Sequence, residues 1–438
     1  MTSHKKNTKN NINCIFCFLT DFHQTELRLL SQMQDERFEN ILRKYKKLFI
    51  SGYQNFLKEN ICEEHQIINE NDIISHLKSI DINEIKEFFD EIIDSVYLEW
   101  IKGNSDVAIK KLKGLITKNG LYGNKFSTNI ANYLFFRGRK IKEKEILNTY
   151  DMFHIPFDKR YLIENQRFSL NGIPLLYLGA SIEDIKYELD IPENGDEIEN
   201  FVFSSYYIKE PVLNVIDLRN PFYIFYNESN NNDLSFEFLP KIEYKQIKTR
   251  LFFLILSSLC RFEKRVQHRL KSKDSNVFFE EYILPQTLTQ AYKSMGEQGI
   301  LFPSTRIKET LKYKEKKKIK HCNLVLFTKY NDERHYDREL YERLVISNPI
   351  SINNIKNFSL EKSHCTLIEK EINNLIKEST NFSENEKIKI INNLNEFKNR
   401  LTSNITSKNY FPSLFEKIEN FLFYNFLVKE CFEVLEEK

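Results

Sequence analysis

The spacing of hydrophobic residues changes twice along this chain, and these changes constrain its fold more than any other feature. Residues 20–120 have apolar side chains at helical spacing, most clearly in residues 81–100. Asp81 and Glu84 form a capping box there. The apolar positions that follow are Ile85, Phe88, Phe89, Ile92, Ile93, Val96 and Trp100. A stripe with this period predicts amphipathic helices with one buried face.

The middle of the chain instead carries short aromatic and β-branched runs, which are typical of strands. These runs are residues 133–136, 175–178, 201–208, 212–218, 222–226 and 324–327, and helical patterns separate them at 181–189, 247–269 and 286–295. Helical spacing returns after about residue 350, with a capping box at Ser383 and Glu386 and an amphipathic stretch at 411–436. The sequence therefore predicts an α+β protein: a helical domain at 1–125, a mixed domain at 126–345 and a helical region at 346–438.

Composition limits the classes of function. The 438 residues are 41% hydrophobic and 13% aromatic, with 11 glycines and 10 prolines, which excludes collagen-like and broadly disordered chains. Lysine and arginine number 64 and aspartate and glutamate 62, so the formal charge of +2 disfavours nucleic acid as the main partner. A lysine-rich run at 312–320 is expected to be a solvated loop, and the alternative is attraction of nucleic acid or phosphate substrates.

The apolar runs and the cysteines predict a cytoplasmic protein. The longest apolar run, 251–260, is half as long as the roughly 20 residues that a bilayer needs, so we expect a buried helix and no membrane partner. The first residues lack the apolar core and the cleavage pattern of a signal peptide. Seven scattered cysteines do not form the even-numbered framework of a secreted disulfide-rich domain.

Several common catalytic motifs do not occur in the sequence. It contains no GxGxxG after a strand, no GxxxxGK[ST], no HExxH and no GxSxG. Rossmann dehydrogenases, P-loop NTPases, zincins and serine hydrolases are therefore disfavoured as classes.

Two pairs of soft ligands near the N-terminus predict a structural zinc site. Cys14 and Cys17 form the first pair, and Cys62 and His65 form the second. Two x-x-spaced pairs can each wrap one edge of a tetrahedral ion, and the long loop between them adds little closure entropy. The alternative is that they are ordinary cysteines beside an exposed histidine.

Seven short segments follow one another in an order that carries a family resemblance. They are FRGR at 136–139, MFHIPFDKR at 152–160, QRFSLNGIPLLYLGAS at 166–181, YEL at 187–189, YILPQTLTQ at 282–290, GILFPSTR at 299–306 and NLVLF at 323–327. Together they resemble the RES domain, a bacterial family named for its arginine, glutamate and serine, over about residues 130–330. The resemblance implies an ADP-ribosyltransferase-like central fold and an enzyme that consumes NAD, in many members as the toxin of a toxin–antitoxin pair.

The resemblance also implies roles for individual residues. The implied catalytic residues are Arg137, Glu188 and Ser304, and the implied NAD-binding residues are Arg137, Arg139, Arg167, Tyr177 and Ser304. Arg137 and Arg139 compete for the position of the family's first arginine. Helices like those of residues 1–125 precede the RES domain in larger members and are sometimes grouped with HEPN-type helices. HEPN ribonucleases need an arginine followed four to six residues later by histidine, which residues 1–125 lack.

Physical chemistry supports these roles separately. Cleavage of the nicotinamide–ribose bond builds positive charge on the ribose, which a fixed carboxylate such as Glu188 stabilises. A guanidinium grips a pyrophosphate with two hydrogen bonds, as Arg137 and Arg167 are expected to do. Tyr177 is expected to contact nicotinamide, and Ser304 the ribose or the amide. The alternatives are a solvated helix-face carboxylate for Glu188, core packing for Tyr177 and a helix N-cap for Ser304.

The sequence leaves the acceptor open. NAD is expected to be cleaved by phosphorolysis or hydrolysis, and the alternative enzyme transfers ADP-ribose to a target protein. An alternative from another class is a catalytically inactive, zinc-clipped interaction module. The expected partners are NAD and inorganic phosphate, an antitoxin or target protein, and a second copy of the chain.

Overall fold

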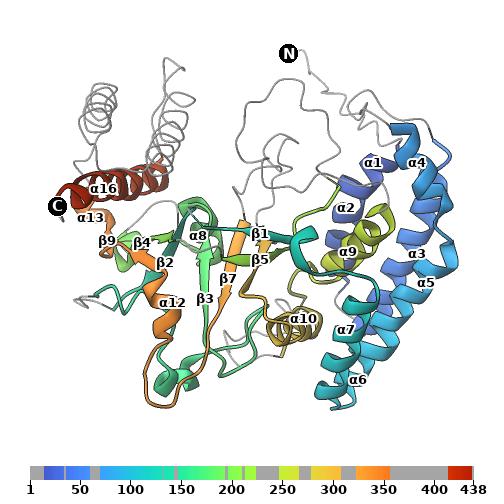
Figure 1. The fold of residues 1–438 in the computed structure, drawn as a ribbon, viewed down its shortest axis with the longest axis horizontal. Coiled ribbons are helices and arrows are strands. Elements are labelled where there is room, and N and C mark those ends of the chain that lie inside the picture. The colour runs from blue at the N-terminus through green and yellow to red at the C-terminus, as the bar shows by residue number, and fades with distance from the viewer. Residues whose placement is uncertain are drawn as a thin grey trace.

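The computed structural model has a helical N-terminal region beside a mixed sheet, which confirms the predicted α+β class (Figure 1). It describes residues 14–33, 36–59, 70–131, 133–142, 147–192, 196–209, 213–222, 246–265, 278–306, 322–355 and 413–436. The boundaries of the three predicted domains stay predictions.

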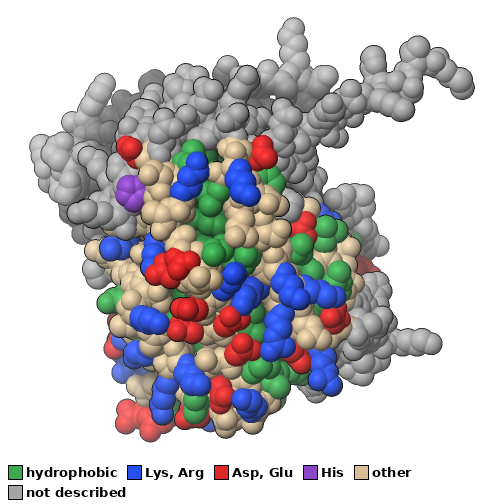
Figure 2. All heavy atoms as spheres, turned by 90° about the vertical axis from the view of Figure 1, so that its right-hand side faces the viewer, with side chains coloured by type: hydrophobic (Ala, Val, Ile, Leu, Met, Phe, Trp, Pro, Cys, Tyr) green, Lys and Arg blue, Asp and Glu red, His purple; other side chains and the backbone are tan. Residues whose placement is uncertain are grey.

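The N-terminal helices bury the predicted apolar stripe from Ile85 to Val96 and leave Trp100 partly exposed. They are α1 (Ile15–Cys17), α2 (His23–Ser31), α3 (Phe38–Phe56), α4 (Glu70–Ser79), α5 (Ile82–Asp90), α6 (Leu98–Ile101) and α7 (Ser105–Lys118), with π-helical turns at Phe18–Phe22 and Glu91–Tyr97. The Asp81 half of the predicted capping box is confirmed, because its carboxylate accepts a hydrogen bond from the Asn83 amide at 2.9 Å, whereas the Glu84 carboxylate pairs with Lys248. On the outer face of these helices lysine and arginine mix with aspartate and glutamate (Figure 2). Exposed ion pairs there, such as Arg43–Asp94, add little stability.

Within the described residues the sheet has nine strands and is antiparallel except where β5 meets β6. The strands are β1 (Ser127–Asn129), β2 (Leu134–Lys140), β3 (Leu175–Gly179), β4 (Phe201–Ile208), β5 (Asn214–Asp217), β6 (Gly299–Pro303), β7 (Cys322–Phe327), β8 (Leu344–Ile346) and β9 (Ile350–Ser351). Their order is β1-β5-β6-β7-β3-β2-β4-β8, and β9 pairs with β4. Phe222 lies in a turn rather than in the strand predicted at 222–226, and residues 223–226 lie outside the described ranges.

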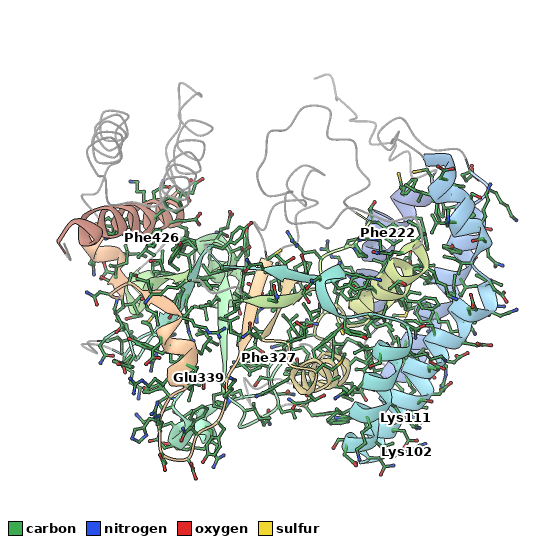
Figure 3. The ribbon with its side chains drawn as sticks, in the orientation of Figure 1. Lys102, Lys111, Phe222, Phe327, Glu339 and Phe426 are labelled. Carbon is green, nitrogen blue, oxygen red and sulfur yellow. The ribbon has the colours of Figure 1, made fainter. Side chains whose placement is uncertain are left out.

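Two helices join the N-terminal region to the sheet. These are α9 (Ile247–Leu259) and α10 (Ile283–Ser294), and both lie between the N-terminal helices and the strands (Figure 1). The predicted buried helix is confirmed, since Leu251 to Leu259 of α9 are all buried. Phe252 stacks on Phe88 with ring centroids 4.4 Å apart. Phe222 and Phe327, labelled in Figure 3, belong to the same hydrophobic core.

The prediction of a helix over 247–269 is wrong at its C-terminal end. The helix ends at Leu259, and residues 261–265 have no regular secondary structure. The carbonyls of Cys260 and Phe262 instead accept hydrogen bonds from the side chain of Arg167. These long-range hydrogen bonds outweigh the local helical propensity of the residues after Leu259. Residues 266–269 lie outside the described part of the chain.

Three further helices lie at the other end of the sheet: α12 (Arg338–Glu342), α13 (Ile352–Ile355) and α16 (Leu414–Glu436). Short 3-10 turns lie at Gly123–Lys125 beside β1, at Phe157–Leu162, at Asp196–Asn200 and at Glu280–Tyr282 beside α10. The helix predicted at 411–436 is confirmed by α16, whereas Ser383 and Glu386 lie outside the described ranges. Among the helices that the structure describes, none combines the length and the apolarity that crossing a bilayer requires.

Helix α8 (Ile182–Glu188) packs closely on β2 and β3 because both strands present a glycine to it. A Cβ on Gly138 would lie 2.6 Å from Ile185 Cγ2, and one on Gly179 would lie 3.0 Å from Ile185 Cγ1. Ser181 is the N-cap, and its hydroxyl accepts from the Asp184 amide at 3.0 Å. Glu188 is the last residue of α8, so the packing of this helix on the sheet positions it.

Candidate active site

The Glu188 carboxylate is the meeting point of three segments of the chain. Its Oε1 accepts hydrogen bonds from Ser304 Oγ at 3.0 Å and from Asn323 Nδ2 at 2.8 Å. Its Oε2 lies 3.3 Å from Nε of Arg306. The Glu188 side chain is still 36% exposed, so a ligand can reach it. Glu188 and Ser304, both predicted from sequence, are thus brought together.

Arg306 is fixed by two carboxylates at the end of α8. Its Nη1 donates to Asp190 Oδ2 at 2.8 Å and to the Tyr187 carbonyl at 3.2 Å. Asp190 has a positive φ of 50°, a conformation that aspartate tolerates better than most residues. Burial disfavours the charge of Arg306, but Asp190 and Glu188 outweigh it and raise the pKa of the guanidinium.

Arg167 belongs to the cluster of side chains around Glu188, Ser304 and Arg306, and backbone carbonyls hold its guanidinium. Its Nη1 donates to the Cys260 carbonyl at 3.0 Å and to the Phe262 carbonyl at 2.8 Å. Its Nη2 donates to Thr305 Oγ1 at 3.1 Å, next to Ser304. The guanidinium also lies 5.0 Å from the centre of the Tyr282 ring, which is a cation–π distance.

Two tyrosines and a lysine complete this side of the cluster. The Tyr177 hydroxyl accepts from the Phe168 amide at 3.2 Å, and burial raises the pKa of Tyr177 well above its ordinary value. Burial also raises the pKa of Tyr282. Lys264 lies 4.7 Å from the Phe279 ring centre and 5.8 Å from that of Tyr282. Burial, followed by the charges of Arg306 and Arg167, lowers the pKa of Lys264.

Arg137 and Arg139 are not part of this cluster. Gly138 faces α8, so its neighbours in β2 point to the other face of the sheet. There Arg139 Nη1 donates to the Asp151 carbonyl at 2.7 Å. Burial lowers the pKa of Arg137, and the neighbouring charges that act on it are Tyr206 and Arg139. The roles predicted for both arginines stay predictions.

The predicted zinc site is described only in its first half. Cys14 and Cys17 are buried, with their sulfur atoms 3.4 Å apart and the Cys17 amide 3.3 Å from Cys14 Sγ. Two sulfurs bound to one zinc at about 2.3 Å are separated by roughly 3.8 Å, so this pair fits one edge of a tetrahedron. Cys62 and His65 lie outside the described residues, and the site stays a prediction.

Five residues of the cluster were not singled out from the sequence: Lys264, Tyr282, Thr305, Arg306 and Asn323. Arg306 and Asn323 lie within two of the segments that carried the family resemblance, and Tyr282 begins a third. Their position inside these segments was therefore the sequence signal that could have identified Arg306, Asn323 and Tyr282 as site residues. Lys264 lies in a part of the chain that no motif covers, so its place follows only from the tertiary structure.

Comparison with known proteins finds a partial relative. Over 179 residues the chain is 31% identical to a protein of Bacillus subtilis (strain 168) named "Putative toxin YopC". The similarity covers 40% of this chain and 36% of that protein, so the chain spans about a third of its relative's length. No protein-family model and no solved structure matches the chain. Part of the chain is therefore similar to a protein described as a toxin.

Proposed function

We propose that this protein is a RES-type enzyme that cleaves NAD at the nicotinamide–ribose bond and acts as a toxin. The observation that carries the proposal is the Glu188 carboxylate, which is oriented by Ser304 and Asn323 and remains accessible. The toxin role rests on the similarity to the Bacillus subtilis protein. The choice of NAD rests on the RES resemblance and on the chemistry of the residues around Glu188.

The chemistry places the carboxylate beside the ribose. When the bond from the ribose carbon to the nicotinamide nitrogen breaks, its electron pair leaves with nicotinamide, which becomes neutral, and positive charge develops on the ribose. Glu188 stabilises that charge electrostatically. Because Ser304 and Asn323 both donate to Oε1, the carboxylate is oriented before the substrate arrives.

The cationic side chains suit the phosphates of a dinucleotide. Arg167 and Arg306 approach Glu188 from different elements, and Lys264 lies beside them. Guanidinium groups bind phosphate oxygens with directed hydrogen bonds, whereas an ammonium group acts as a point charge. Tyr177, which is partly buried, is the proposed aromatic contact of a flat ring such as nicotinamide, whereas Tyr282 is 5% exposed and supports the Arg167 guanidinium.

The test is to incubate the purified protein with NAD, with and without inorganic phosphate, and to identify products by chromatography and mass. ADP-ribose 1-phosphate would identify phosphate as the acceptor, free ADP-ribose would identify water, and a mass gain on an added lysate protein would identify transfer. Glu188→Gln is the inactive control. Glu183→Gln is the matched control, because Glu183 lies in the first turn of the same helix. The proposal fails if NAD stays intact in every condition or if Glu188→Gln consumes it like the wild type.

A further inference from the structure

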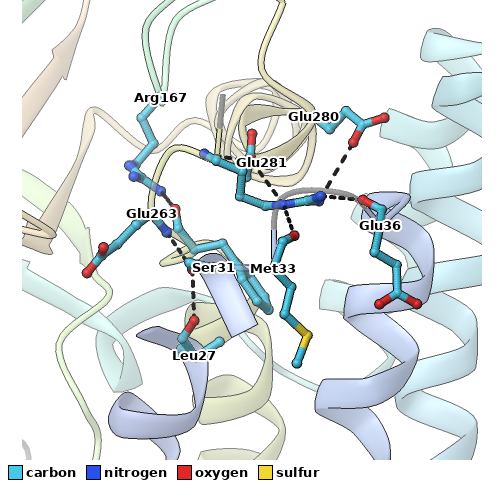
Figure 4. Close-up of polar contacts among 10 residues, drawn as sticks. Leu27, Ser31, Met33, Glu36, Arg167, Glu263, Glu280 and Glu281 are labelled. Carbon is cyan, nitrogen blue, oxygen red and sulfur yellow. Dashed lines mark hydrogen bonds and ion pairs between the residues drawn. The ribbon is translucent and has the colours of Figure 1, made fainter. Parts of the chain in front are cut away.

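Residues 260–265 connect Arg167 to the N-terminal helices (Figure 4). On one side, the carbonyls of Cys260 and Phe262 accept from Arg167 Nη1 at 3.0 and 2.8 Å. A guanidinium is planar, so the positions of its acceptors fix the direction of its remaining N–H groups. The conformation of residues 260–265 therefore sets the orientation of Arg167.

The other side of this segment is held by the N-terminal region. The Glu263 amide donates to Ser31 Oγ at 3.0 Å, and Ser31 Oγ donates to the Leu27 carbonyl at 2.8 Å, so α2 anchors the segment. Arg265 Nε donates to the Met33 carbonyl at 3.2 Å, and Arg265 Nη2 donates to the Glu36 carbonyl. The residues that fix the segment thus lie more than 200 positions away in the sequence.

Arg265 also fixes the element that carries Tyr282. Its amide donates to Glu281 Oε1 at 3.1 Å, and its Nε lies 3.7 Å from the same oxygen. The two side chains are 5% and 1% exposed. Burial raises the pKa of Glu281, although Arg265 opposes this. Glu281 directly precedes Tyr282, the ring beneath Arg167.

A buried pair of this kind is a poor source of stability. Arg265 Nη1 and Glu281 Oε2 have no hydrogen-bond partner within the described ranges, and Nη1 has only a long ion pair of 3.8 Å with Oε2 of the partly exposed Glu280 (Figure 4). Removing charges from water costs free energy that an incomplete network does not recover, so a well-packed apolar pair would serve stability at least as well. The Arg265–Glu281 pair is explained if it holds residues 260–265 and the Glu280–Tyr282 turn in one fixed arrangement.

We infer that Arg265 is a positioning residue that, with Ser31 and Glu281, orients Arg167 and so makes the N-terminal helices part of the substrate-binding site. This inference rests on the proposed function, in which Arg167 binds the phosphates of NAD. An arginine that binds substrate and transition state equally affects KM more than kcat. Disturbing its support should have the same kinetic signature.

The kinetic test uses two mild variants of the full chain. Arg265→Lys keeps the charge but cannot reach both carbonyls, and we expect KM for NAD to rise about tenfold while kcat changes less than about twofold. Ser31→Ala removes the anchor of Glu263, and we expect KM to rise about threefold. Both effects should disappear in an Arg167→Lys background, because residues that act through one another are not additive.

Lys248→Met is the matched control. Lys248 on α9 pairs with Glu84 on α5 at 2.6 Å, so it also links the N-terminal helices to the rest of the chain, and the interactions of its ammonium group among the described residues are with Glu84 and the Phe252 ring. We expect its KM and kcat to equal those of the wild type. An increase in KM as large as that of Arg265→Lys would assign the effect to loosening of the whole interface and would overturn the inference.

Hydrogen–deuterium exchange gives a readout that needs no turnover. Phe168 follows Arg167 in the sequence, and its amide donates a hydrogen bond to the Tyr177 hydroxyl. Exchange of this amide therefore reports on the opening of the loop that carries Arg167. We expect Arg265→Lys and Ser31→Ala to speed exchange at residues 166–169 and 260–265. If NAD is never consumed but exchange spreads in this way, the proposed function fails and the positioning role stands. If NAD is consumed but Ser31→Ala leaves both KM and exchange unchanged, the positioning role fails, even where Arg265→Lys does not fold.

Discussion

The two faces of β2 differ in how they satisfy their polar groups. On the α8 face, Glu188 accepts from Ser304 and Asn323 and pairs with Arg306, and it is still 36% exposed. On the opposite face, Arg137 and Ser204 lie directly across from each other in the β2–β4 register. Arg137 Nη1 and Ser204 Oγ are buried there without a hydrogen bond among the residues that the structure describes.

This difference separates an arginine whose guanidinium is oriented by oxygen partners from one whose guanidinium is not. Arg167 and Arg137 were both predicted to bind phosphate. Arg167 has three oxygen partners and lies near the accessible carboxylate, whereas Arg137, which is partly exposed like Arg167, lies beside Tyr206 and has a buried Nη1 without a hydrogen-bond partner among the described residues. A guanidinium binds a ligand well when the protein orients it in advance. We therefore expect the α8 face to carry the chemistry.

The largest expected effect is on Glu188. Replacing it by Gln removes the negative charge but keeps the shape and one acceptor oxygen. Loss of transition-state stabilisation should lower kcat for NAD cleavage by about a thousandfold. Thermal unfolding should change little, because the side chain is partly exposed. Cleavage rates measured alongside melting curves check both statements, and a variant that melts early would leave the rate loss without catalytic meaning.

Arg167 and Arg137 provide the direct test of the comparison. Arg167→Lys should lower kcat/KM by about a hundredfold, because lysine cannot reproduce a two-pronged phosphate contact. Arg137→Met should leave kcat/KM within about threefold and the free energy of unfolding unchanged or higher, because it removes a buried Nη1 that has no hydrogen-bond partner among the described residues. Steady-state kinetics and urea unfolding of the two variants decide. If Arg137→Met loses as much activity as Arg167→Lys, the two faces serve one site.

The Arg137 face should also respond to pH. His154 is 1% exposed, and its Nε2 accepts from the Asp337 amide at 3.0 Å. Burial lowers the pKa of His154 to about 4. Since the unfolded chain takes up the proton first, stability is complete above about pH 6.5 and is lost as pH falls toward 4. We expect about 2 kcal/mol to be lost between pH 7 and pH 5. His154→Gln should flatten this part of the urea-unfolding profile, and an unchanged slope would contradict the assignment.

The smallest expected effects come from two serines. Ser304→Ala removes one of two donors to Glu188 Oε1 and should lower kcat about tenfold. Ser204→Ala removes a hydroxyl that has no hydrogen-bond partner in the described part of the chain, and it should leave kcat unchanged, with equal or higher stability. Measured together, they compare the same substitution on both faces. Equal losses of activity would remove the distinction between the faces.

Local parts of this site could be predicted from the sequence. The run before Ser181 reads as a strand and the residues after it as a helix, and β3 and α8 lie there with Ser181 as the N-cap. The family resemblance then singled out Glu188, Ser304 and Arg167, which the structure places in one cluster. These predictions depend on residues close in sequence or on a known order of segments.

The rest depends on tertiary pairing that local spacing does not encode. Asn323 meets Glu188 because β7 pairs with β3, and Arg306 meets it because β6 pairs with β7. Strand alternation predicts that Arg137 and Gly138 point to opposite faces of the sheet. Only the packing of α8 against Gly138 shows on which face the Glu188 carboxylate lies. Likewise, the early end of α9 follows from the contacts of Cys260 and Phe262 with a distant arginine.

The order in which the partners of Glu188 appear along the chain has a consequence for protein synthesis. Asn323 follows Glu188 by 135 residues, and Ser304 follows it by 116. At about 5–20 residues per second, a ribosome needs roughly 7–27 s to go from the carboxylate to its last partner. A nascent chain therefore carries Glu188 well before it can complete the site. Any activity of this cluster therefore begins only after Asn323 has been synthesised and β7 can pair with β3.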